Sequence, residues 1–142
     1  DNTKSLLITR GLAEISRFGC MLGADPVTFS GLAGVGDLMV TCASKLSRNF
    51  RVGFRLGQGE TLEEILGSMV EVAEGVRTTA IALEIAKKIG ATLPIAEGMN
   101  RLLNEGASTK DVVQLLMTRR AKYELPGAPN YADSEIPSTS KN

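Results

Sequence analysis

The sequence predicts an all-α protein. No stretch of the 142 residues alternates apolar and polar side chains between turn signals, as a half-buried strand would. Apolar residues instead recur at spacings of three and four, and capping residues, glycines and prolines divide the chain into short segments. These observations together predict about seven or eight helices.

The first predicted helix covers residues 3–22. Ile8, Leu12 and Ile15 belong to an apolar side that continues along this segment, and Gly23 follows it as a stop. The opposite side of this helix carries Arg10, Glu14 and Arg17. We therefore expect an amphipathic helix with its apolar side in the core.

A second, short helix is predicted to begin at Asp25 and Pro26. Aspartate is a good N-cap, and proline is favoured in the first helical turn. After about residue 30, the glycine-rich segment 31–36 predicts a joint, and residues 37–42 predict another helical segment.

The later helices carry clear start signals. Ser47 is a plausible N-cap for a helix over 48–57, and Thr61 with Glu64 forms a capping box for a helix that reaches about residue 68. Further helices are predicted over 75–88 and 94–103, and Ser108 is the predicted cap of the last one.

Composition excludes several classes of function. Sixteen basic and sixteen acidic residues cancel, so no overall field would attract nucleic acid or an anionic membrane. The chain has no histidine, which argues against a zinc site and against a histidine general base. Cys20 and Cys42 are too far apart for a paired metal motif, and we expect two buried reduced thiols.

The predicted domain organisation is simple. Residues 1–125 contain the helical signals, whereas residues 126–142 are polar, contain three prolines and have almost no large aliphatic side chains. We expect a helical domain followed by a flexible polar tail. The chain begins at Asp1 rather than Met, within the approach to a helix, which suggests a piece of a longer protein.

Ser47, Arg48 and Asn49 are the first candidate site residues. A helix that begins after Ser47 would place Arg48 and Asn49 beside free backbone N–H groups, where a phosphate is favoured. The arginine fork matches phosphate oxygens, and the asparagine amide can pair with a neighbouring hydroxyl. The alternative is an exposed arginine and a capping asparagine on a solvated face.

Asp37 and Glu74 are the other candidates. Asp37 follows two glycines and precedes an apolar run, so it either caps a helix or points into a cleft, with Thr41 on the same face. Glu74 lies just ahead of a helix, where it is either a favourable helix-start anion or an acceptor for a bound cofactor.

Several of these motifs together resemble one protein family. The motifs that support this resemblance lie at residues 1–4, 8–14, 31–38, 46–49 and 74–76. They occur in the same order as in the family, and family-like spacing continues to about residue 125. They look like the C-terminal domain of NAD(P)-dependent glycerol-3-phosphate dehydrogenase, of the bacterial or plastid type. The resemblance implies an all-α, multi-helix domain of the 6-phosphogluconate-dehydrogenase-like type, normally paired with an N-terminal Rossmann domain that is absent here.

The resemblance also implies a function. Such enzymes interconvert dihydroxyacetone phosphate and sn-glycerol 3-phosphate with NAD or NADP, for glycerophospholipid synthesis. By resemblance, Asp37 would be catalytic and would contact substrate together with Ser47, Arg48 and Asn49. The cofactor-binding residues would be Arg48, Val72 and Glu74, and no metal is expected.

One departure from the family pattern is important. The family's proton-transferring lysine lies upstream, in an Ala-Leu-Lys-Asn segment that this sequence does not contain. We therefore expect this chain alone to be inactive. The resemblance further suggests a homodimer in the cytoplasm, or alternatively in the plastid stroma.

Two alternatives to this function remain open. The chain could be the helical domain of a related hydroxyacid dehydrogenase, which would not need Ser47, Arg48 and Asn49 for a phosphate. It could also be a non-catalytic helical module whose apolar faces bind a partner.

Overall fold

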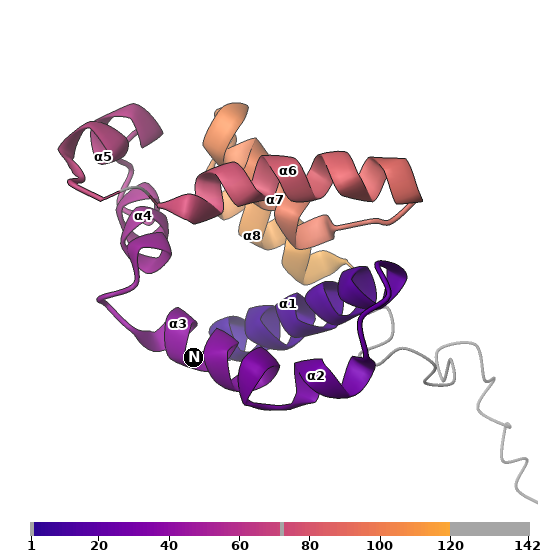
Figure 1. The fold of residues 1–142 in the computed structure, drawn as a ribbon. Helices are drawn as coiled ribbons and strands as arrows, with labels where there is room; N and C mark the ends of the chain where they lie inside the picture. Colours follow the sequence, from indigo (N-terminus) through magenta and orange to yellow (C-terminus); the bar gives the residue numbers. More distant parts are fainter. Residues whose placement is uncertain (1, 72, 120–142) are drawn as a thin grey trace, which may run out of the picture.

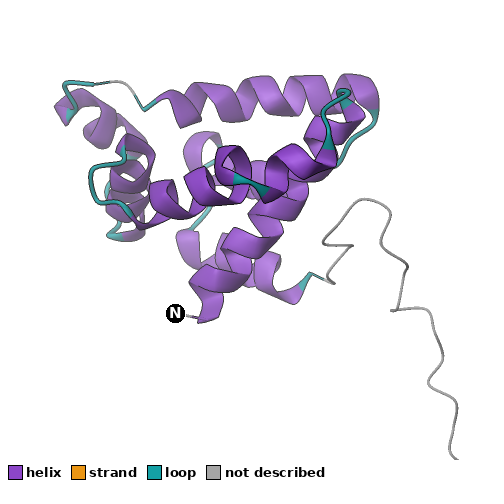
Figure 2. Cartoon of the chain, turned by 60° about the horizontal axis from the view of Figure 1, so that its bottom comes forward, coloured by secondary structure: helices purple, strands orange, loops and turns teal. Residues whose placement is uncertain are grey.

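A computed structural model describes residues 2–71 and 73–119 of the chain, and within these ranges it contains helices and loops but no strand (Figure 2). The predicted all-α class is therefore confirmed. The described elements are α1 (Asn2–Met21), α2 (Pro26–Ser30), the π-helical turn η1 (Leu32–Gly36), α3 (Asp37–Ala43), α4 (Arg48–Gly57), α5 (Leu62–Ser68), α6 (Glu74–Ile89), α7 (Pro94–Asn104) and α8 (Thr109–Thr118). Among the described residues, no helix combines the length and the apolar composition that a membrane-spanning segment requires.

Helix α7 lies at the centre of the arrangement. It contacts α1, α6 and α8, and α6 runs across it in Figure 1. Helices α2 and α3 pack against α1, whereas α4 connects α3 to α5 and also contacts α6. The start of α4 is thereby brought close to the start of α6.

The predicted caps are present. The Asp25 side chain accepts a hydrogen bond from the Val27 N–H at 2.9 Å, and Ser47 Oγ accepts from the Phe50 N–H at 3.3 Å. Thr61 and Glu64 form the predicted capping box at the start of α5. Ser108 Oγ accepts from the Asp111 N–H at 3.1 Å. Local sequence signals therefore set the beginnings of these four helices correctly.

The glycine-rich joint takes a more specific form than expected. Residues Leu32–Gly36 make a π-helical turn, in which the Gly36 N–H donates to the Gly31 carbonyl at 3.4 Å. A Cβ atom at Gly34 would clash with the carbonyl oxygen and Cα of Phe29, so only glycine fits here without a backbone shift. The close approach of two backbone segments explains why glycine stands at position 34 of this joint.

The expected orientation of α1 is partly wrong. Glu14, predicted to lie on the polar side, is only 6 % exposed, whereas Ile15 is exposed. The Glu14 carboxylate accepts hydrogen bonds from the Ile95 and Ala96 N–H groups at 2.8 and 3.0 Å. Burial raises the pKa of Glu14, and the two backbone N–H groups oppose that shift. The carboxylate is buried because it satisfies backbone donors at the start of α7.

A buried cluster of the described residues is aliphatic and joins α4, α5 and the segment before α6. Its buried members are Val52 of α4, Ile65 of α5 and Ala73, which directly precedes α6. This cluster fixes the three elements against one another and so holds the start of α4 beside the start of α6. The predicted tail, residues 126–142, lies outside the described residues, so the domain boundary near residue 125 stays a prediction.

Candidate functional site

An open hollow of about 420 Å³ lies where α3, α4 and α6 approach one another. It combines the end of α3, the loop before α4, and the first turns of α4 and α6. Its lining residues are Val40, Thr41, Ser44, Leu46, Ser47, Arg48, Asn49 and Glu74. Four of the six residues predicted for the site, namely Ser47, Arg48, Asn49 and Glu74, therefore share one hollow.

Arg48 is the first residue of α4, because Ser47 caps this helix. Its Nε lies 3.7 Å from a Glu71 carboxylate oxygen, and both side chains are exposed. An exposed pair of this kind contributes about 0–1 kcal/mol, so a bound phosphate could compete for the guanidinium. Arg48 and the free N–H groups of the first turn together can bind an anion.

Asn49 joins the two helix starts. Its Oδ1 accepts a hydrogen bond from the Gly75 N–H at 3.1 Å. Ala73, the N-cap residue of α6, has no side-chain oxygen, and no side chain of its own segment caps this helix. Asn49 therefore supplies from α4 the acceptor that a serine or aspartate would normally supply locally.

Glu74 is the first residue of α6, and its exposed carboxylate lines the hollow. A negative charge at this position is favoured by the helix dipole. A carboxylate at an open hollow can also accept hydrogen bonds from the hydroxyl or amide groups of a ligand. The two interpretations from the sequence are thus compatible in the structure.

Asp37 is not among the residues that line the hollow. It is the first residue of α3, it is exposed, and the N-cap of this helix is Gly36, without a side-chain hydrogen bond. The capping interpretation of Asp37 is therefore wrong. Thr41, one turn further along the same helix, does reach the hollow. Val72, the last predicted residue, lies outside the described residues.

The two cysteines are free and half-buried, rather than fully buried as expected. Burial raises the pKa of the Cys42 thiol, and the positive charge of Lys4 partly opposes this shift. A raised pKa keeps the thiol protonated and poorly reactive. In the described ranges 2–71 and 73–119, no group of three His, Cys, Asp or Glu residues could hold a metal ion.

Sequence reasoning missed how α6 begins. A signal was available, because Ala73 precedes Glu74 and cannot cap a helix, so an acceptor had to come from elsewhere in the chain. The sequence alone could not show that this acceptor is Asn49, which lies 26 positions away. Val40, Ser44 and Leu46 also line the hollow and were not predicted as site residues, although the motif at 46–49 includes Leu46.

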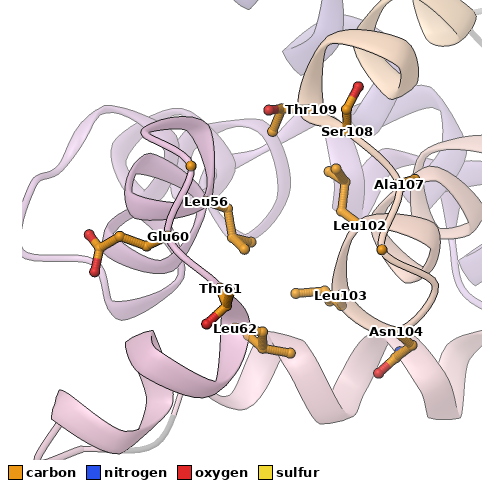
Figure 3. Close-up of a pocket in the computed structure, with 12 residues that line it drawn as sticks. Leu56, Glu60, Thr61, Leu62, Leu102, Leu103, Asn104, Ala107, Ser108 and Thr109 are labelled. Carbon is orange, nitrogen blue, oxygen red and sulfur yellow. The ribbon is translucent and has the colours of Figure 1, made fainter.

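A second hollow of about 420 Å³ lies between the α4–α5 and α7–α8 turns. Figure 3 shows Leu56 and Leu62 on one side of it and Leu102 and Leu103 on the other. None of the predicted site residues lines it.

Three polar side chains of this second hollow, those of Glu60, Thr61 and Ser108, already have partners within the chain. Thr61 and Ser108 cap α5 and α8. Glu60 pairs with Arg55, whose guanidinium holds the pKa of this carboxyl below its usual range. The second hollow is therefore explained by the packing of two helix turns.

The described fold is an all-helical domain with polar and charged side chains gathered around an open hollow at two helix starts, an arrangement typical of domains that bind a small anionic ligand. A sequence model of one family, described as "NAD-dependent glycerol-3-phosphate dehydrogenase C-terminus", matches residues 1–114. The chain belongs to this family.

Named relatives agree with this membership. The glycerol-3-phosphate dehydrogenase [NAD(P)+] of Geobacillus kaustophilus is 54% identical over 136 residues, which are 95% of this chain and 40% of the relative. The corresponding protein of Leptospira biflexa is 52% identical over 123 residues, which are 87% of this chain and 37% of the relative. The chain therefore spans about two fifths of the length of such relatives.

A crystal structure shows the same fold. Glycerol-3-phosphate dehydrogenase from Coxiella burnetii superposes with a TM-score of 0.81 at 35% sequence identity, covering 84% of this chain and 37% of that protein. The helical arrangement described above is thus the fold of a part of a longer enzyme.

Proposed function

We propose that this chain forms the substrate-binding part of an NAD(P)-dependent glycerol-3-phosphate dehydrogenase, which interconverts dihydroxyacetone phosphate and sn-glycerol 3-phosphate. The observation that carries this proposal is the single hollow shared by Ser47, Arg48, Asn49 and Glu74. A phosphorylated triose needs a cationic fork for its phosphate and uncharged donors for its hydroxyl and carbonyl oxygens, and this hollow supplies both.

Each residue has a definite task in this proposal. Arg48 and the first N–H groups of α4 hold the phosphate, and the amide of Asn49 donates to a substrate oxygen. Because substrate is held at its non-reacting end, the binding energy positions the carbonyl for reaction. Asp37 orients the lysine that protonates the carbonyl oxygen, a lysine that relatives would carry upstream of the matched region.

The side chains of Glu74 and Arg48 at the hollow fit one edge of a dinucleotide. Glu74 offers an acceptor for ribose hydroxyl or carboxamide groups, and Arg48 offers a cation on the same hollow. No strand occurs in residues 2–71 or 73–119, so the Rossmann unit that would hold the rest of the dinucleotide must come from another part of the enzyme. When bound, the nicotinamide supplies or accepts the hydride.

The test uses a chimera in which this chain replaces the matching part of the Geobacillus kaustophilus relative. We expect the chimera to oxidise NADH or NADPH when dihydroxyacetone phosphate is added. Arg48→Ala should raise the KM for dihydroxyacetone phosphate by about 10- to 100-fold, because a charge-assisted hydrogen bond contributes about 1.5–3 kcal/mol.

Two controls accompany this measurement. Arg119→Ala, an exposed arginine at the end of α8 on another part of the domain, should leave the KM for dihydroxyacetone phosphate unchanged. The isolated chain should show no turnover. An active chimera in which Arg48→Ala has normal kinetics would refute the phosphate role, and would favour a hydroxyacid substrate instead.

The remaining expectations belong to the same proposal. The enzyme would supply glycerol 3-phosphate for glycerophospholipid synthesis, act in the cytoplasm and form a homodimer. Residues 1–125 would be its helical substrate domain. Light scattering of the chimera would determine its oligomeric state.

A further inference from the structure

We propose that Asn49 is a positioning residue that couples the phosphate side of the hollow to its cofactor side, through the hydrogen bond to α6. This inference rests on the proposed function and adds a second task to that of Asn49 as a substrate donor. Its physical basis is that the oxygen of one amide group caps α6, while the nitrogen of the same group is left for a ligand.

The Oδ1 atom of Asn49 is committed to α6. It accepts from the Gly75 N–H at 3.1 Å, and Gly75 is the second residue of this helix. Because the first N–H groups of a helix lack partners within it, an acceptor here stabilises the first turn. That first turn carries Glu74, so the position of the Glu74 carboxylate depends on Asn49.

The Nδ2 group of Asn49 has the opposite role. It donates no hydrogen bond within the described residues, and the side chain lines the hollow beside Arg48. The amide is thus fixed by its oxygen and presents its two N–H donors to a ligand. Substrate bound by this amide would hold it in the orientation that also caps α6.

Gly75 makes this contact possible. A Cβ atom at Gly75 would lie 2.6 Å from Asn49 Oδ1 and 2.9 Å from its Cγ, so any larger residue would displace the amide. The contact therefore needs both partners: an asparagine on α4 and a glycine on α6. Gly53, also helical and on α4, offers a matched control, because a Cβ atom added there would meet nothing within 4 Å.

The test separates the two ends of the Asn49 amide in the active chimera. Asn49→Asp keeps the oxygen that caps α6 but removes the donors and adds a charge that repels phosphate. We expect it to raise the KM for dihydroxyacetone phosphate by about tenfold or more, while the Kd for NADH stays within about twofold. Asn49→Ala removes both functions and should weaken NADH binding by about fivefold as well.

Gly75→Ala provides an independent measurement, since it leaves Asn49 in the chain but displaces its amide. It should weaken NADH binding about as much as Asn49→Ala does, whereas Gly53→Ala should leave that binding unchanged. If Asn49→Ala does not fold, then Asn49→Asp, Gly75→Ala and Gly53→Ala still complete the comparison.

The outcomes distinguish three roles. Coupling is overturned if Gly75→Ala leaves NADH binding unchanged, which would leave Asn49 as a substrate donor only. Coupling is also overturned if Asn49→Asp leaves both the KM for dihydroxyacetone phosphate and the Kd for NADH as they are in the unsubstituted chimera. That result would indicate a purely structural cap. If Arg48→Ala leaves the KM for dihydroxyacetone phosphate unchanged, the proposed function itself is refuted. If Arg48→Ala impairs activity but Gly75→Ala leaves NADH binding unchanged, only the coupling is refuted.

Discussion

At the scale of single residues, two side chains cap helices that begin far away in the chain. Asn49 accepts from the start of α6, and Glu14 accepts from two N–H groups at the start of α7. Both helices follow an apolar residue, Ala73 or Leu93, that cannot cap them. Their first turns therefore depend on tertiary contacts rather than on local sequence.

The cap that Glu14 forms on α7 can be tested by its contribution to stability. Glu14→Ala should lower the free energy of unfolding of the chain by at least about 2 kcal/mol, because two N–H groups lose their acceptor in a place with little water. Urea unfolding of this chain measures the loss. Glu84→Ala, at an exposed position of α6, is the control and should change stability by less than about 0.5 kcal/mol. Equal effects of the two substitutions would mean that Glu14 contributes no cap.

At the scale of elements, the short helices around η1 determine where the hollow lies. The π-helical turn leads from α2 into α3, and the end of α3 supplies Thr41 and Ser44 to the hollow. A π-helical turn contains one more residue per hydrogen-bonded ring than an α-helix, so it changes the direction in which the next side chains project.

Gly34→Ala tests the importance of this turn. The added methyl would meet the Phe29 carbonyl oxygen and Cα, which are backbone atoms that cannot move cheaply. We expect a loss of about 1–3 kcal/mol in thermal or urea unfolding, as for other overpacked sites. Gly67→Ala in α5, where nothing lies within 4 Å, should be neutral or stabilising because alanine favours a helix. A neutral Gly34→Ala would contradict the close approach.

At the scale of the whole molecule, the described segment that leads to the hollow carries four exposed large apolar side chains. Val40 and Leu46 line the hollow, and Leu32 and Met39 belong to η1 and α3, which precede it in the chain. Scattered apolar residues are normal on a surface, but neighbouring ones beside a candidate site are typical of a face that another part of the protein covers. In relatives about two and a half times as long, we expect the N-terminal part to cover this face.

The apolar face and the core should therefore respond differently to truncation in the isolated chain. Leu46 is 89 % exposed, so Leu46→Ala should change the free energy of unfolding by less than about 0.5 kcal/mol. Leu103 is 8 % exposed, so Leu103→Ala should lower the free energy of unfolding by about 2–5 kcal/mol. Urea unfolding of both variants checks this, and a large loss in Leu46→Ala would show that this face is already buried within the chain.

The local sequence was sufficient for the helices and for four of the residues around the hollow. Asp25, Ser47, Thr61 and Ser108 mark helix starts because a short polar side chain bonds N–H groups only two or three positions ahead. The starts of α4 and α6 were predicted within a residue, and with them the places of Arg48 and Glu74.

Contacts between segments far apart in the sequence determine which groups meet. Glu14 and Ile95 lie 81 positions apart, and Asn49 and Gly75 lie 26 apart, so no helical periodicity relates them. The apolar spacing along α1 suggested that Glu14 faces water, but two unpaired N–H groups of α7 make its burial favourable. Local sequence signals therefore predict the helices and the candidate residues, because caps and apolar spacing act over a few positions. Packing between distant segments is what brings some of those residues into one site.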